Sequence, residues 1–120
     1  MQFPPPVRLT SYDIKSLSVI KEKLESDPGK HHFIADLGHQ HGLSIPKLKF
    51  GFQKLYGVSP HKYLHDRRMR LALELLSDDH KKLFAIAKAT GYRHLSTFVT
   101  AFKNYYGQTP GYYRNNNVGD

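Results

Sequence analysis

The feature that most constrains this 120-residue chain is a motif that occurs twice, about 50 residues apart. Each copy has a glycine, a phenylalanine, a Tyr-Gly pair, a proline and a tyrosine in the same order. The matching residues are Gly42 and Gly91, Phe52 and Phe102, Gly57 and Gly107, Pro60 and Pro110, and Tyr63 and Tyr113. The first pair is separated by 49 positions and the others by 50, so the second copy carries one extra residue just after its glycine. Two copies are too few for a solenoid, and the repeat therefore predicts two similar small units.

The spacing of the apolar residues predicts an all-α chain, because no stretch alternates at the period of two that is typical of strands. The expected helices span about 11–26, 32–40, 45–56, 60–77, 82–90 and 95–106, with one or two further turns after Pro110. Gly42 and Gly91 each separate two short helices, and Gly57 and Gly107 each close a helix. The side chains expected to face inward include Ile14, Leu17, Ile20, Leu24, Ile34, Leu37, Leu48, Phe52, Leu55, Leu83, Ile86, Ala87, Phe98 and Phe102.

These elements divide the chain into five expected segments. Residues 1–10 are a proline-rich linker remnant, 11–58 a first helix-turn-helix subdomain, 59–77 a linking helix, 78–116 a second helix-turn-helix subdomain, and 117–120 a tail. The start of the chain has no apolar core of a signal peptide, and no apolar run approaches the ~20 residues of a membrane span.

The charge of the chain favours a polyanionic partner. It has 18 Lys and Arg against 10 Asp and Glu, and 13 of the basic residues but only 4 of the acids lie between Leu43 and Arg114. Ribosomal, membrane-surface and heparin-like partners would require the same sign. The absence of Cys excludes disulfides and thiol chemistry. No nucleophile–base set or phosphate-binding loop is present, so we expect no enzyme and no cofactor.

A short helix, a glycine turn and a second helix form the layout of a helix-turn-helix, whose second helix enters the major groove of DNA. The expected linking helix, at ~1.5 Å per residue, is about 27 Å long, and successive major-groove faces lie ~34 Å apart. Two such units on one chain therefore predict two helices that occupy adjacent major grooves of one duplex without a dimer.

The repeated residues also carry a resemblance to a known family. The matching residues are Gly42-Leu43-Ser44, Leu48, Phe52, Tyr56-Gly57, Pro60, Tyr63-Leu64, Arg68-Met69, Ala72, Leu75-Leu76, Ile86-Ala87, Gly91-Tyr92, Phe98, Phe102-Lys103, Tyr106-Gly107, Thr109-Pro110 and Tyr113-Arg114. Over about 11–114 the chain resembles the DNA-binding domain of the AraC/XylS family of bacterial transcription regulators, including its one-residue insertion in the second unit.

Several expectations follow from this resemblance. It implies seven helices, two helix-turn-helix units bridged by a long helix, and sequence-specific binding to promoter DNA with activation through RNA polymerase. It also implies a separate effector or dimerisation domain before this one. We therefore expect part of a longer regulator that acts on DNA in the bacterial cytoplasm, monomeric as an isolated domain, with dimerisation of the full-length protein left open.

The residues expected to contact bases lie on the outward faces of the two second helices. They are Pro46, Lys49, Phe50 and Gln53 in the first unit and His94, Leu95, Ser96, Val99 and Thr100 in the second. Lys49 is suited to guanine, Gln53 to adenine and Phe50 to a thymine methyl group. Phe50 has a second interpretation, as a contact within the core or with a partner. The second unit lacks Arg, Asn and Gln at these positions, so we expect it to use hydroxyls, methyl contacts and DNA shape.

The residues expected to contact phosphates are Lys47, Lys54, Arg67, Arg68, Arg93, Thr97, Lys103 and Arg114. Ser96 and Thr97 have a second interpretation, as residues that only start a helix. About six phosphate contacts would give a log–log salt slope near −5.

Two other classes of function remain open. A basic helical module that binds RNA or an acidic protein has the same charge. A metal protein is suggested by the 8 His residues, but His31-His32 and the pair His39 and His41 are poorly spaced for chelation on a helix. We therefore expect no metal site.

Overall fold

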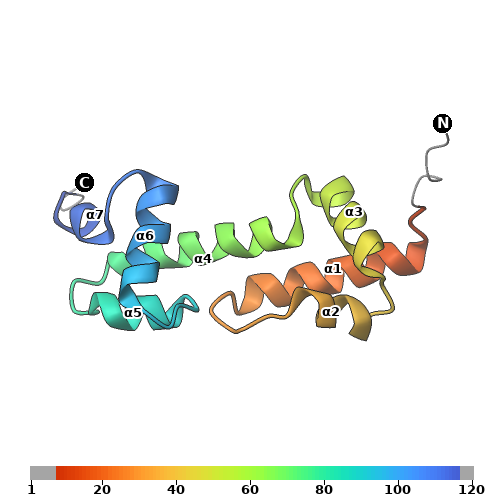
Figure 1. Ribbon diagram of the computed structural model, residues 1–120, viewed down its shortest axis with the longest axis horizontal. Helices are drawn as coiled ribbons and strands as arrows, with labels where there is room; N and C mark the ends of the chain where they lie inside the picture. Colours follow the sequence, from red (N-terminus) through yellow and green to blue (C-terminus); the bar gives the residue numbers. More distant parts are fainter. Residues whose placement is uncertain (1–7, 117–120) are drawn as a thin grey trace. The chain divides into compact units, whose positions relative to one another are not determined.

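The computed structural model describes residues 8–116 and contains seven α-helices and no strand in that range. In chain order they are α1 (Ser11–Ser26), α2 (Ile34–Gln40), α3 (Ile45–Tyr56), α4 (Pro60–Leu76), α5 (Leu83–Ala89), α6 (Leu95–Tyr106) and α7 (Pro110–Asn116) (Figure 1). The all-α prediction is therefore confirmed, and the helix ends differ from the expected ones by two residues at most. Residues 1–7 of the predicted linker and the predicted tail at 117–120 lie outside the described residues.

The chain divides into two compact units. One comprises residues up to Ser26 together with His32–Leu64, and the other comprises Asp27–His31 together with the residues from His65 onward. α4 thus contributes its first turn to one unit and the rest of its length to the other. Each unit has a core of its own, and each is described separately below.

In the first unit, α1 and α2 pack against α3 (Figure 1). The core is formed by buried aliphatic residues around one fully buried aromatic ring: Leu17, Ile20, Leu24, Ile34, Leu37, Leu43, Leu48, Leu64 and Phe52. Ile14 and Leu55 were expected to face inward, but their exposed fractions are 44% and 38%. The buried stripe of α1 passes through positions 13, 17, 20 and 24, at helical spacing, and Ile14 lies beside it.

Gly51 explains how α1 approaches α3 so closely. A Cβ atom at Gly51 would lie 2.5 Å from Leu17 Cδ1 and 3.1 Å from Leu9 Cδ2. A glycine within a helix costs about 1 kcal/mol relative to alanine. In this unit that cost is offset by the packing of two leucines directly against the backbone of α3.

In the second unit, α6 packs against α5 and α7 (Figure 1). Its core contains Met69, Ala72, Leu76, Ile86, Ala87, Phe98 and Phe102. Leu83, which was expected inside, is partly buried against this core. The segment Asp27–His31 also belongs to this unit, where a Cβ at Gly29 would clash with the carbonyl oxygen of Ala89.

The repeated aromatic residues form the same cluster in both units. The Phe52 ring lies 4.8 Å from that of Tyr56 and 5.5 Å from that of Tyr63, while the Phe102 ring lies 4.7 Å from that of Tyr106 and 5.5 Å from that of Tyr113. The matching prolines, Pro60 and Pro110, are fully buried at the start of the helix that follows. The residues that the two copies share are therefore mainly those that build the scaffold.

Candidate nucleic-acid interface

The same tight turn joins α2 to α3 in the first unit and α5 to α6 in the second. Gly42 (φ 72°) and Gly91 (φ 93°) adopt the left-handed conformation that other residues rarely tolerate. In the first turn the Leu43 N–H donates to the Gly38 carbonyl oxygen at 2.8 Å, and in the second the Tyr92 N–H donates to the Ala87 carbonyl oxygen at 2.9 Å. These turns are the helix-turn-helix geometry that the sequence predicts.

The second helix of each helix-turn-helix, α3 or α6, is called the recognition helix of its unit below. The two helices begin differently. Ser44 caps α3, its Oγ accepting a hydrogen bond from the Lys47 N–H at 3.3 Å. His94 occupies the cap position of α6 without a side-chain hydrogen bond to the helix. The extra residue of the second copy, Arg93, lies in its turn and is exposed.

On α3 the four residues expected to contact bases are all exposed: Pro46, Lys49, Phe50 and Gln53. The exposed fraction of Phe50 is 39%, which removes its interpretation as a core residue. The Gln53 Nε2 donates a hydrogen bond of 2.8 Å to the carbonyl oxygen of Gly57. The side chain of Gln53 thus satisfies the C-terminal end of its own helix, and its role as a base contact stays a prediction.

In the second unit the cap residue His94 is exposed, as are Leu95, Ser96 and Thr100 of α6. Val99 differs from the expectation of an outward side chain, because it is half-buried and packs against the core of its unit. Its neighbour Phe98 is the fully buried ring of this helix turn, and Val99 lies at the edge of the same apolar face. The exposed residues expected to contact bases in this unit are consequently a histidine, a leucine and two hydroxyl-bearing residues.

Among the residues expected to contact phosphates, Lys54, Arg93, Thr97 and Lys103 are exposed. Arg67 is half-buried, and its Nε atom is buried without a hydrogen-bond partner. An open groove beside the turn of the second unit is lined by His31, Lys88, Gly91, Tyr92 and Arg93. The basic side chains of Lys88 and Arg93 therefore line this groove, next to the start of α6.

Three of the expected phosphate contacts bind groups within their own unit. Lys47 Nζ lies 2.9 Å from Asp13 Oδ2. Arg68 donates from Nε to the Pro28 carbonyl oxygen at 2.7 Å and from a terminal nitrogen to that of Lys30 at 3.1 Å. Arg114 donates to the carbonyl oxygen at position 78 at 3.1 Å. Their assignment to phosphates stays a prediction, while their role within the fold is visible.

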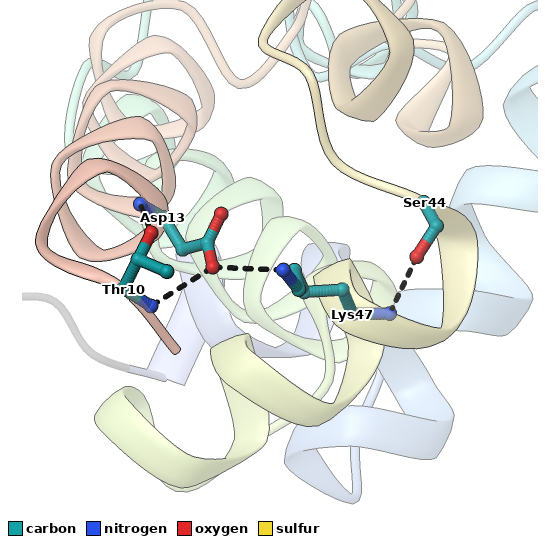
Figure 2. A network of polar contacts seen from close by, with 4 residues as sticks. All are labelled: Thr10, Asp13, Ser44 and Lys47. Atoms are coloured by element: carbon teal, nitrogen blue, oxygen red, sulfur yellow. Dashed lines mark hydrogen bonds and ion pairs between the residues drawn. The ribbon is translucent and has the colours of Figure 1, made fainter. Parts of the chain in front are cut away.

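Asp13 is a residue that the sequence analysis did not single out, although it is buried at the start of α1. The Thr10 N–H donates to its carboxylate at 2.9 Å, and its own N–H donates to the Thr10 hydroxyl at 3.0 Å (Figure 2). The Thr10 backbone hydrogen bond, followed by the Lys47 ammonium, holds the pKa of Asp13 below its ordinary value. The spacing Thr-x-x-Asp before an apolar stripe is a capping-box pattern, and this signal could have identified it.

Burial also shifts pKa values in the second unit. It raises the pKa of the Tyr92 hydroxyl and lowers that of the neighbouring Arg68 guanidinium.

Within residues 8–116, no cluster of three or more His, Asp or Glu side chains is placed to hold a metal ion. None of the described helices combines the length and the hydrophobicity needed to cross a bilayer.

Comparison with known proteins identifies the family. Residues 37–116 match a family model described as a helix-turn-helix domain. The transcriptional regulator AlkR of Acinetobacter baylyi is 31% identical over 110 residues, which are 92% of this chain but 36% of AlkR. The chain spans about a third of the length of this and other curated relatives.

Solved structures show the same fold. A transcriptional regulator from Chromobacterium violaceum, described as containing an AraC-type DNA-binding domain, is 22% identical with a TM-score of 0.76, over 92% of this chain and 98% of that one. The DNA-binding domain of AdpA, a global transcriptional factor solved with a target DNA, is 20% identical with a TM-score of 0.76, over 82% of this chain and 89% of that one. The chain therefore belongs to the AraC-type helix-turn-helix family of DNA-binding domains of transcription regulators.

Proposed function

We propose that this chain recognises a specific duplex DNA sequence on behalf of a bacterial transcription regulator, with α3 and α6 each entering a major groove of the same duplex. The observation that carries the proposal is the shared construction of the two units. Each has a glycine turn with positive φ followed by a recognition helix with an exposed outer face. That construction fits a major groove.

The two recognition helices contribute differently to this function. α3 presents Lys49 and Phe50, an ammonium suited to guanine and a ring suited to a thymine methyl group. α6 presents His94, Ser96 and Thr100, so its half of the site is read mainly through hydroxyl groups and DNA shape. We therefore infer stronger base discrimination in the half of the site that α3 reads.

The surrounding cations supply affinity for the backbone. Lys54, Arg93 and Lys103 are exposed. Phosphates are the groups that such cations bind on DNA. The proposal extends to activation of transcription through RNA polymerase. We place this activity in the bacterial cytoplasm, on the DNA of the nucleoid. The domain itself would bind as a monomer and would catalyse no reaction.

Selection of bound duplexes from a random pool tests the proposal. We expect one asymmetric site per chain that spans two adjacent major-groove segments, and footprints on one face of the duplex. A palindrome bound only by dimers of this chain would contradict it. Tighter binding to structured RNA than to duplex DNA at matched salt would instead favour an RNA-binding module.

Substitution of Lys49 tests the assignment of the first recognition helix. The Lys49→Met variant keeps the apolar stem and removes the ammonium, so the preferred bases should change in one half of the selected site. A good two-point base contact contributes about 1–3 kcal/mol of discrimination. Lys15→Met, at an exposed position of α1, is the matched control. Equal weakening on all sequences would remove Lys49 from the set of base contacts.

A further inference from the structure

A buried carboxylate joins two helices of the first unit. The side chain of Asp13 is only 6% exposed, although it lies in the first turn of α1, where a capping residue normally meets water. Its reciprocal hydrogen bonds with Thr10 already satisfy the start of α1 (Figure 2). Capping alone does not require this burial, since an exposed cap makes the same bonds.

The second partner of Asp13 comes from the recognition helix. The same oxygen that accepts from the Thr10 N–H lies 2.9 Å from the ammonium of Lys47, whose side chain is 32% exposed (Figure 2). The backbone N–H of Lys47 is held by Ser44. The first turn of α3 is thus fixed twice, at its backbone by its own cap and at a side chain by α1.

The ion pair between Asp13 and Lys47 fixes the orientation of the first turn of α3. A buried carboxylate that lost its cation would be strongly unfavourable, so Lys47 is constrained to face α1. Lys47 lies between Pro46 and Lys49 on the same short helix. Fixing the rotation and the position of its first turn therefore also fixes the residues expected to read bases.

We propose that Asp13 is a positioning residue for base recognition by α3, and that Lys47 acts as its partner rather than as a contact to a DNA phosphate. The inference rests on the proposed function, because it concerns how the first recognition helix meets DNA. It assigns a role in specificity to a residue outside the helix-turn-helix itself.

Two substitutions test the inference, each measured by duplex selection and by the salt dependence of binding. Asp13→Asn and Lys47→Met should both lower affinity for the best duplex about tenfold and flatten base preference in the half read by α3, leaving the other half unchanged. The log–log salt slope of Lys47→Met should equal that of the unaltered chain. Lys47→Arg, which keeps the pair, should retain the original preference.

Opposite results would overturn the inference. If Lys47 contacts a phosphate, Lys47→Met should make the salt slope shallower by about 1 and weaken all sequences alike. Asp13→Asn would then release the ammonium and tighten binding uniformly. Unchanged base preference in both variants would also overturn it.

A control separates positioning from loss of stability. Thermal melts define a temperature at which every variant is folded. Ile20→Val removes one methylene from the core of the same unit without touching the polar contacts of α3, so it should keep the base preference; if it flattens that preference in the same way, the inference fails. If the unaltered chain enriches no duplex, the proposed function fails and the inference with it. If it does enrich one and Asp13→Asn selects the same bases, the inference alone fails.

Discussion

Arg68 donates a hydrogen bond of 2.7 Å from its Nε to the carbonyl oxygen of Pro28. A terminal nitrogen of the same guanidinium reaches the carbonyl oxygen of Lys30, and a Cβ at Gly91 would lie 3.1 Å from the guanidinium. One arginine thus holds the segment after α1 and lies against the turn of the second helix-turn-helix. Its matching position in the family motif therefore has a structural explanation.

Arg68→Ala should destabilise the second unit. Hydrogen bonds to charged groups contribute about 1.5–3 kcal/mol each. Because the Arg68 side chain is only partly buried, its two hydrogen bonds should contribute less than their sum, and we expect a loss of about 2 kcal/mol in the free energy of unfolding. Arg68→Lys should recover little, because an ammonium lacks the planar fork that serves two carbonyls. Urea unfolding measures the loss. Arg70→Ala, at an exposed position of the same helix, is the control, and equal losses in both variants would contradict the assignment.

Gly51→Ala should destabilise the first unit, although alanine is the better helix former. Its methyl group would lie 2.5 Å from Leu17 Cδ1, and overpacking of a core costs about 1–3 kcal/mol. Gly111→Ala in α7 is the matched control, since a Cβ there meets nothing within 4 Å, and it should be neutral or stabilising. Thermal unfolding of the two variants decides the matter, and a stabilised Gly51→Ala would show that Leu17 moves aside freely.

The stability of the first unit should fall in acid through Asp13. The pKa of this group is lower in the folded chain than its ordinary value of 3.8. The unfolded chain therefore takes up the proton first, and the contribution of Asp13 is complete above that value and is lost as the pH falls through the folded pKa. Urea unfolding of the unaltered chain and of Asp13→Asn should differ most above about pH 5 and converge in acid. A difference that is independent of pH would contradict the shift.

Lys103→Gln should weaken binding to all duplexes alike and make the log–log salt slope shallower by about 1. The residue is exposed near the end of α6, and we expect it to contact a phosphate rather than a base. Titrations between about 50 and 200 mM salt give the slope. Lys15→Gln on α1 should leave the slope unchanged. A change of base preference in Lys103→Gln would instead make Lys103 a base contact.

The sequence predicted the helices and their ends well, because helix ends are set by residues close to them in the sequence. Glycines with positive φ at Gly42, Gly57, Gly91 and Gly107 and the cap at Ser44 act within a few residues. Their effect on the backbone can therefore be inferred without knowledge of the tertiary structure.

What the sequence could not predict depends on contacts between distant segments. Arg68 looks like a solvated surface charge until Pro28 is placed beside it. The capping-box spacing marks Asp13 as the start of a helix, but it does not reveal the ion pair with Lys47. Similarly, Gly51 signals a close approach, but only the structure identifies Leu17 as the group that approaches. The candidate base contacts were found by helical phase alone, and Val99 shows the limit of that method, because it lies at the boundary between the two faces of α6.

The aromatic cluster repeated in both units has a consequence for which residues can vary. The aromatic and proline side chains that the two copies share are buried or partly buried, whereas the outer faces of α3 and α6 carry different side chains. We therefore expect that substitutions on these outer faces change the DNA sequence that one unit prefers without loss of its fold. A laboratory exchange of those outer residues between relatives should transfer target choice in the same modular way.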